Sequence, residues 1–227
     1  ATAGHRFLAP GPHQVAHARD YVEALRKAHV FVELDERRRT MVERLREAAA
    51  AAGGVLIEDA FLVEENLSLV EEPQIVSGGF DEEFLKLPER VILDVAKGHQ
   101  RYFGVRDAKG KLLPKYLAVV NTAENPENVR RGNDRVMRAR LADAKFFYET
   151  DLAMPLAERR SKLEGVVFHK RLGSVADKVQ RIERVVPLLG AELGLADDVV
   201  QTALAGAALC KCDLVTLMVG ELPELQG

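Results

Sequence analysis

Apolar residues in the first fifty positions of the chain occur at both helical and extended spacing. Residues 7–15 contain two prolines and a glycine and predict extended chain with a turn, whereas residues 20–28 carry an apolar stripe at helical spacing. The short β-branched run 29–34 predicts a strand. Asp35 is then expected to cap a second amphipathic helix that ends at Gly53-Gly54.

Shorter elements follow up to residue 122. Their patterns predict strands and short helices in alternation, namely strands at 55–57 and 74–76 and helices at 82–87 and 88–97. Residues 60–70 fit a helix only slightly better than a strand. Two further strands, 102–106 and 113–120, flank the turn 107–110 and predict a hairpin. This alternation is typical of an α+β domain.

The pattern changes after Asn125-Pro126, where only helical spacing is found. The predicted helices span residues 128–148, 155–164, 174–193, 197–210 and 214–219. We therefore predict an α+β domain over residues 1–153 and an all-α domain over residues 154–227. The chain lacks an initiator Met and stops directly after an apolar helical pattern, so we expect a fragment with a truncated second domain.

Composition and charge argue against a membrane protein, a secreted disulfide-rich protein and a uniformly basic nucleic-acid-binding protein. The net charge is -3, so contact with a nucleic acid needs a local basic patch. There is no run of about 18 apolar residues and no signal-peptide pattern at the start. The two cysteines cannot form a disulfide framework. We expect a soluble, cytoplasmic protein without a membrane partner.

One candidate binding segment is Lys97-Gly98-His99-Gln100-Arg101-Tyr102-Phe103. Its Lys97, His99 and Arg101 stand beside two aromatic rings, a combination that can contact phosphates or bases of RNA. The same residues also fit a glycine that ends a helix, with solvated charges around it. The residues alone leave both interpretations open.

The densest basic run lies at residues 130–140, where Asp134 is the single acid. On a helix, arginines at i, i+4 and i+7 form one stripe opposite the apolar face of Met137 and Leu141, and such a stripe suits successive phosphates. The candidate contacts are Arg131, Arg135, Arg138 and Arg140. Alternatively, the stripe is a solvated face paired with Asp134, Asp143 and Glu149, or with the acidic stretch 64–72.

Cys210-Lys211-Cys212-Asp213 and the distant His169 contain ligand types for zinc. Thiols two residues apart on a helix point about 200° apart, because each residue turns a helix by about 100°. We therefore predict buried small residues there and no metal site. The sequence has no nucleophile elbow, phosphate loop or dinucleotide fingerprint, and we predict no catalytic residue.

Five strings in the chain resemble the beta subunit of the bacterial two-subunit glycyl-tRNA synthetase. They are GHRFLAP at 4–10, KGHQRYF at 97–103, NDRVMRARLADAKFF at 133–147, FHKRLGS at 168–174 and KCDLVT at 211–216. The likeness covers nearly the whole chain in one unbroken order. The second and third strings are highly specific.

The resemblance implies a tRNA-binding polypeptide that works with a small alpha subunit, where glycine is activated with ATP. ATP and magnesium are therefore expected at the alpha subunit, and no cofactor in this chain. The expected partners are the alpha subunit and tRNA for glycine, with no DNA. The resemblance also implies a first domain similar to the editing-type domain of phenylalanyl-tRNA synthetase, followed by an HD-like helical domain.

The chain departs from HD hydrolases where those enzymes carry an adjacent His-Asp pair. Cys212-Asp213 stands there, and His169 alone cannot hold an ion. The resemblance therefore implies a non-catalytic, tRNA-binding part of a glycine–tRNA ligase. Two alternatives stay open: a metal-dependent phosphohydrolase of HD type, and an assembly module that binds the alpha subunit without touching RNA.

Overall fold

The computed structural model describes residues 1–122 and 124–227, except for the side chain of His99. Its contacts divide the chain into two compact units, residues 1–142 and 143–227. The division lies within helix α5 (Pro126–Leu152), upstream of the boundary that the sequence suggests.

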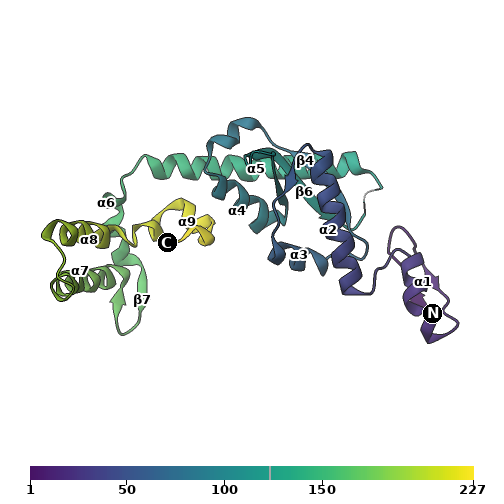
Figure 1. Ribbon diagram of the computed structural model, residues 1–227, viewed down its shortest axis with the longest axis horizontal. Helices are drawn as coiled ribbons and strands as arrows, with labels where there is room; N and C mark the ends of the chain where they lie inside the picture. The colour runs from purple at the N-terminus through teal and green to yellow at the C-terminus, as the bar shows by residue number, and fades with distance from the viewer. Residues whose placement is uncertain (123) are drawn as a thin grey trace. The chain divides into compact units, whose positions relative to one another are not determined.

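The first unit is built on a four-stranded antiparallel sheet with strand order β3-β5-β6-β4 (Figure 1). Its strands are β3 (Val55–Leu56), β4 (Gln74–Gly79), β5 (Phe103–Arg106) and β6 (Leu112–Val120). The predicted hairpin is confirmed as β5 and β6. Asp107 closes its turn by accepting the N–H groups of Lys109 and Lys111, and Gly110 adopts a φ of +83° there.

Helices cover both faces of this sheet. Besides α5, these are α2 (Leu34–Ala51), α3 (Ala60–Leu67), η2 (Glu82–Lys86) and α4 (Glu89–Gln100), whereas η1 (Ala18–Asp20) and α1 (Tyr21–Lys27) lie near the N-terminus, away from the sheet. Phe103 and Leu117, which pair across β5 and β6, are buried in one core with Met41 of α2. The next pair, Gly104 and Tyr116, faces the opposite side, because side chains alternate along a strand. Helices α4 and α5 pack on that side.

A short two-residue ladder precedes these elements, between β1 (Thr2–Ala3) and β2 (Pro12–His13). The strand predicted at residues 29–34 is wrong. His29 instead has a φ of 59° and ends α1, where the N–H groups of His29 and Val30 bond back to the last turn of the helix. Asp35 is also not a cap, because α2 already begins at Leu34.

The second unit contains seven helical segments after α5 in the described chain, the last of them the short 3-10 helix η5 (Pro223–Leu225). The others are α6 (Leu156–Arg159), η3 (Arg160–Gly165), α7 (Val175–Glu192), α8 (Asp197–Leu209), η4 (Cys212–Val215) and α9 (Leu217–Glu221). Leu163, Val175, Val179 and Cys212 form a buried cluster among them. Ser174 and Asp177 form a capping box that begins α7.

The prediction that this part is all-α is wrong. A small hairpin joins β7 (Val167–His169) to β8 (Gly173–Ser174), and Gly173 adopts a φ of +87° at its turn. Strands of two and three residues are too short to show an alternating pattern, so the sequence could not reveal them. Among the described residues, no helix is long and apolar enough to span a membrane.

Candidate nucleic-acid interface

Helix α5 presents a row of arginines at its surface. Arg131, Arg135 and Arg138 are all exposed, and Met137 and Leu141 are fully buried, as the helical spacing predicts. The helix is longer than expected, because it runs from Pro126 to Leu152. We call Arg131, Arg135 and Arg138 the arginine stripe.

The stripe is only weakly neutralised by the chain itself. Nη2 of Arg131 donates to Oδ1 of Asn128 at 2.8 Å, and Nε of Arg138 lies 3.1 Å from Oδ2 of Asp81. Both partners in the second pair are more than half exposed, and such surface ion pairs contribute little. Arg135 makes no hydrogen bond or ion pair within the part of the chain described. The stripe is therefore available to an external anion.

Arg140, the fourth candidate on α5, differs from the stripe in its environment. It is half-buried, and within residues 1–122 and 124–227 it has neither a hydrogen bond nor an ion pair. A guanidinium whose N–H groups are all unbonded can donate hydrogen bonds to a phosphate oxygen. Arg140 therefore remains a candidate contact.

Asp134 does not neutralise the stripe but anchors α5 to the sheet. Its Oδ1 accepts hydrogen bonds from the Tyr116 hydroxyl at 2.7 Å and from the Gly79 N–H at 3.0 Å. Its Oδ2 accepts from Nη1 of Arg130 at 2.7 Å. Burial, followed by the hydrogen bond to Asp134, raises the pKa of Tyr116 well above its usual value. These contacts fix the rotation of α5.

Gly78 of β4 is the place where this anchor is most easily broken. A Cβ atom at Gly78 would overlap the hydroxyl of Tyr116 and lie 2.5 Å from Oδ1 of Asp134. We expect Gly78→Ala to lower the free energy of unfolding by about 2–3 kcal/mol, because overpacking a filled site forces its neighbours apart. Urea unfolding measures this loss.

The matched control is Gly132→Ala, at a position in α5 where a Cβ atom meets nothing within 4 Å. Alanine favours a helix over glycine by about 1 kcal/mol, so this variant should be slightly more stable than the parent. Equal stability of the Gly78→Ala variant and the parent would contradict the proposed anchor.

The second candidate segment begins inside α4. This helix continues to Gln100, so Gly98 lies within it, and the glycine-capped helix end considered from the sequence is wrong. Arg101 itself ends the helix with a φ of 56°, and the Tyr102 N–H bonds back to the Ala96 carbonyl at 3.0 Å. The intact i, i+4 bonding through Gly98 outweighs the preference of glycine for a helix end.

Lys97 and Arg101 are paired with the N-cap residue of α3 and with an acid within α3. Nζ of Lys97 lies 2.6 Å from Oδ2 of Asp59 and 5.2 Å from the centre of the Phe61 ring, while Nε of Arg101 lies 3.4 Å from a Glu65 carboxylate oxygen. Burial acts to raise the pKa of Asp59, but hydrogen bonds from Lys97 and the Leu62 N–H outweigh it and lower the pKa.

The two groups of candidates are thus not equivalent. Among the hydrogen bonds and ion pairs of the described residues, none joins Lys97 or Arg101 to the arginine stripe. The side chain of His99 lies outside the described part of the structure. Lys97 is held by Asp59 at 2.6 Å, and Arg101, like Arg138 of the stripe, has an exposed carboxylate partner. Arg135 has no such partner among the described residues, so the stripe is the stronger candidate for phosphate contacts.

The residues with metal-binding chemistry are dispersed. Cys212 is fully buried, and its Sγ donates to the Ala208 carbonyl at 3.8 Å, whereas Cys210 and His169 are exposed. Burial raises the pKa of the Cys212 thiol. The prediction that both cysteines lie on one helix is wrong, because α8 ends at Leu209, and the prediction that they are buried is wrong for Cys210. In the described ranges, no three His, Cys, Asp or Glu side chains lie close enough to hold a metal ion.

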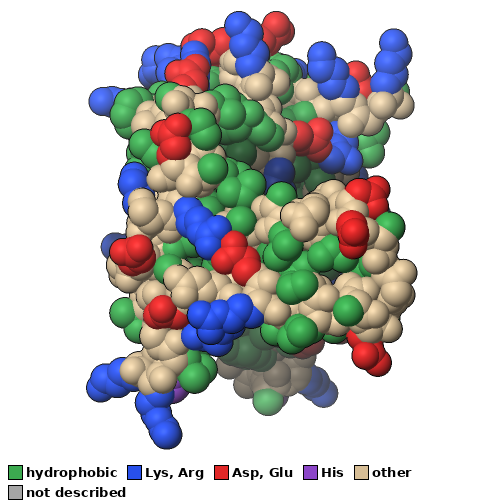
Figure 2. All heavy atoms as spheres, turned by 90° about the vertical axis from the view of Figure 1, so that its left-hand side faces the viewer, with side chains coloured by type: hydrophobic (Ala, Val, Ile, Leu, Met, Phe, Trp, Pro, Cys, Tyr) green, Lys and Arg blue, Asp and Glu red, His purple; other side chains and the backbone are tan. Residues whose placement is uncertain are grey.

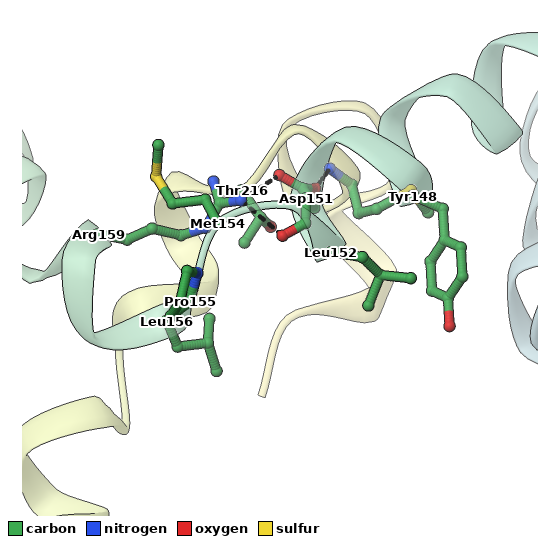
Figure 3. Close-up of a pocket in the computed structure, with 9 residues that line it drawn as sticks. Tyr148, Asp151, Leu152, Met154, Pro155, Leu156, Arg159 and Thr216 are labelled. Atoms are coloured by element: carbon green, nitrogen blue, oxygen red, sulfur yellow. Dashed lines mark hydrogen bonds and ion pairs between the residues drawn. The ribbon is translucent and has the colours of Figure 1, made fainter.

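A pocket of about 370 Å³ lies in the second unit beside Asp151 and Arg159 (Figure 3). Most of its lining is apolar, including Leu152, Leu156 and Met218. The two charged groups bind each other, with Nη2 of Arg159 at 3.1 Å from Oδ1 of Asp151. We regard this pocket as part of a structural junction, because its charges are already compensated.

Comparison with known proteins assigns the family. A family model described as glycyl-tRNA synthetase beta subunit matches residues 1–227. The chain belongs to this family. The glycine–tRNA ligase beta subunits of Moorella thermoacetica and Myxococcus xanthus are each 46% identical to it over 227 residues, and that of Rhodospirillum centenum is 43% identical over 228 residues.

These matches cover 100% of this chain but only 33%, 32% and 32% of the three relatives in that order. This beta-subunit chain therefore spans about a third of the length of the relatives. The resemblance drawn from the sequence strings is confirmed at the level of the family.

Sequence reasoning missed two features of this beta-subunit chain. The anchoring role of Asp134 had no local signal, because its partners Tyr116 and Gly79 are distant in sequence. Phe7 was noticed only as part of a family string, yet its side chain is 55% exposed. An Arg-Phe pair within a Gly- and Pro-rich turn was the signal that could have marked it.

Proposed function

We propose that this chain is a non-catalytic, tRNA-binding part of a glycine–tRNA ligase beta subunit, and that it supports glycylation of tRNA carried out on an alpha subunit. The observation that carries the proposal is the exposed arginine stripe of α5, held outward by the anchor at Asp134. ATP and magnesium would act at the alpha subunit.

The geometry of the stripe suits an RNA backbone. From Arg131 to Arg138 the helix rises by about 10 Å, at about 1.5 Å per residue, so its three guanidiniums form a row rather than a point charge. Arginine can bind phosphate oxygens with two parallel hydrogen bonds. Such contacts position a nucleic acid without reading its sequence.

A salt series tests this function. We expect the chain to bind tRNA for glycine, with an affinity that falls roughly 20- to 40-fold between 50 and 200 mM salt if three phosphates are contacted. Filter binding with a non-cognate tRNA as the comparison measures this. A preference for the glycine tRNA that survives high salt would show recognition beyond charge. If the chain did not bind tRNA for glycine at 50 mM salt, the proposed function would be contradicted.

A second candidate function, assembly with another polypeptide, is favoured by the apolar surface of the second unit. Leu188 of α7 and Leu193, which follows it, are 69% and 67% exposed. Figure 2 shows hydrophobic side chains lying among the charged ones on this side. Val185, Leu189 and Leu195 are exposed as well, and several exposed apolar side chains within residues 185–195 favour an interaction surface there. Capture of the alpha subunit, with and without tRNA, separates assembly from RNA binding.

The domain likenesses implied by the family strings remain part of this proposal. We propose that the first unit corresponds to an editing-type domain and the second to an HD-like scaffold. The exposed His169 and the buried Cys212 do not form a ligand set, so the described donors do not support the hydrolase alternative. Measurement of zinc, manganese and iron in the purified chain tests that point.

A further inference from the structure

Residues 5–9 form a turn that is fixed by one buried histidine. His5 is fully buried, and its Nδ1 accepts the N–H groups of Phe7 at 3.2 Å and Leu8 at 3.1 Å. Nδ1 therefore carries no hydrogen, and Nε2 donates to the Asn121 carbonyl at 2.7 Å. The Ala9 N–H also bonds to the His5 carbonyl at 3.0 Å, so the backbone of the turn is held at both ends.

Close packing holds the same turn against α1. The His5 N–H donates to the Ala28 carbonyl at 2.9 Å. A Cβ atom at Gly4 would lie 2.6 Å from Nε2 of His13 and 2.8 Å from Cβ of Ala28, so only glycine allows this approach. The turn is therefore a rigid platform rather than a loose loop.

The side chains displayed by this platform are Arg6 and Phe7. Phe7 is 55% exposed, and the guanidinium carbon of Arg6 lies 5.7 Å from the centre of its ring. Arg6 is exposed and has no hydrogen bond or ion pair in the part of the chain that the structure describes. A ring left half in solvent by a rigid turn adds little to the core, because most of its apolar surface stays in water.

One cation, Arg6, lies beside the ring, and exposed apolar neighbours are few in this segment. The other cations of residues 1–32, Arg19, Arg26 and Lys27, already pair with carboxylates, so Arg6 is the one without an ion pair among the described residues of this segment. Among residues 1–33, all of which are described, Phe7 and Tyr21 are the only exposed large apolar side chains. A protein interface needs a broader apolar centre. Stacking of one base needs a single ring with a cation beside it.

We propose that the Arg6–Phe7 turn is a stacking site for an unpaired nucleobase of RNA. Phe7 stacks on the base, and Arg6 binds the adjacent phosphate. His5 is a positioning residue, since its Nδ1 holds the backbone N–H groups of Phe7 and Leu8 and it touches no ligand. This inference rests on the proposed RNA binding of the chain, but it uses a surface separate from the arginine stripe.

The test compares Phe7→Ala with Phe7→Trp and with the control Tyr21→Ala, which removes the other exposed ring of this segment. Two probes are used: tRNA for glycine, and a ten-nucleotide single-stranded RNA. We expect Phe7→Ala to weaken both about tenfold with an unchanged salt slope, because stacking adds no counterion release. Phe7→Trp should bind as the parent does, and Tyr21→Ala should have no effect.

The outcomes separate this inference from the proposed function. If Phe7→Ala binds both probes like the parent, the stacking site is overturned while the salt series still supports RNA binding. If the single-stranded RNA depends on Phe7 but tRNA does not bind at all, the stacking site stands and the proposed function fails. If Phe7→Ala loses only capture of the alpha subunit, the turn is a protein contact and the inference is overturned.

Discussion

Charge reversal of the stripe, Arg135→Glu with Arg138→Glu, is expected to weaken binding of tRNA for glycine on the order of 100-fold. Each charge-assisted hydrogen bond contributes about 1.5 kcal/mol, so two lost contacts amount to about 3 kcal/mol. The slope of log affinity against log salt should become shallower by about two, since two phosphates are no longer neutralised. Filter binding over a salt series measures both quantities.

The control for this variant is Lys109→Glu with Lys111→Glu. These lysines are exposed near the turn between β5 and β6, in the same unit as the stripe, and their reversal changes the net charge by the same amount. We expect at most a small, salt-sensitive decrease in affinity. If both double variants lost affinity equally, the effect would be one of overall charge, and the stripe would have no special role.

Asp151→Ala is expected to destabilise the second unit by about 3–5 kcal/mol. Oδ1 of Asp151 accepts the Leu217 N–H at 3.1 Å and Oδ2 accepts the Met218 N–H at 2.8 Å, which secures the start of α9. The same carboxylate pairs with Arg159, whose side chain is only 5% exposed. Without the carboxylate, the buried guanidinium of Arg159 has no counter-charge, and an unpaired buried charge strongly lowers the free energy of unfolding.

Hydrogen exchange followed by mass spectrometry measures this effect for each unit separately, which matters because a chain of two units need not unfold in one step. Exchange should rise over residues 151–163 and 212–222 and stay unchanged over residues 34–120. Asp143→Ala, at an exposed position of the same helix, should stay within about 0.5 kcal/mol of the parent. Unchanged exchange in the Asp151 variant would mean that the junction contributes nothing to stability.

Sequence periodicity predicted the long regular elements well. Strictly spaced apolar residues identified α2, α5, α7 and α8, because burying one stripe of a helix requires such spacing wherever the helix lies. The hairpin of β5 and β6 was also predicted, since the Asp107–Gly110 turn is specified by local chemistry. Most errors lay at short elements, where two or three residues carry no period.

The strand expected at residues 29–34 shows how context overrides local preference. A β-branched run favours extended backbone, but a strand forms only where a second strand lies alongside it. Here the Phe31 N–H donates to the Glu71 carbonyl, and no other backbone bond of residues 29–34 reaches a distant described residue. His29 is in the left-handed region because it ends α1. Neither the lack of a partner strand nor the helix end at His29 can be predicted from the β-branched run itself.

The sequence by itself determined the family, the mixed α+β character of the first unit and the arginine spacing on α5, because strings and helical periods are local properties of the chain. Tertiary structure alone decided which cations are available. It paired Lys97 with Asp59, directed Asp134 to Tyr116 instead of the stripe, and left Arg135 without a partner among the described residues. Pairing of charges depends on distances between elements, and those distances exist only once the chain has folded.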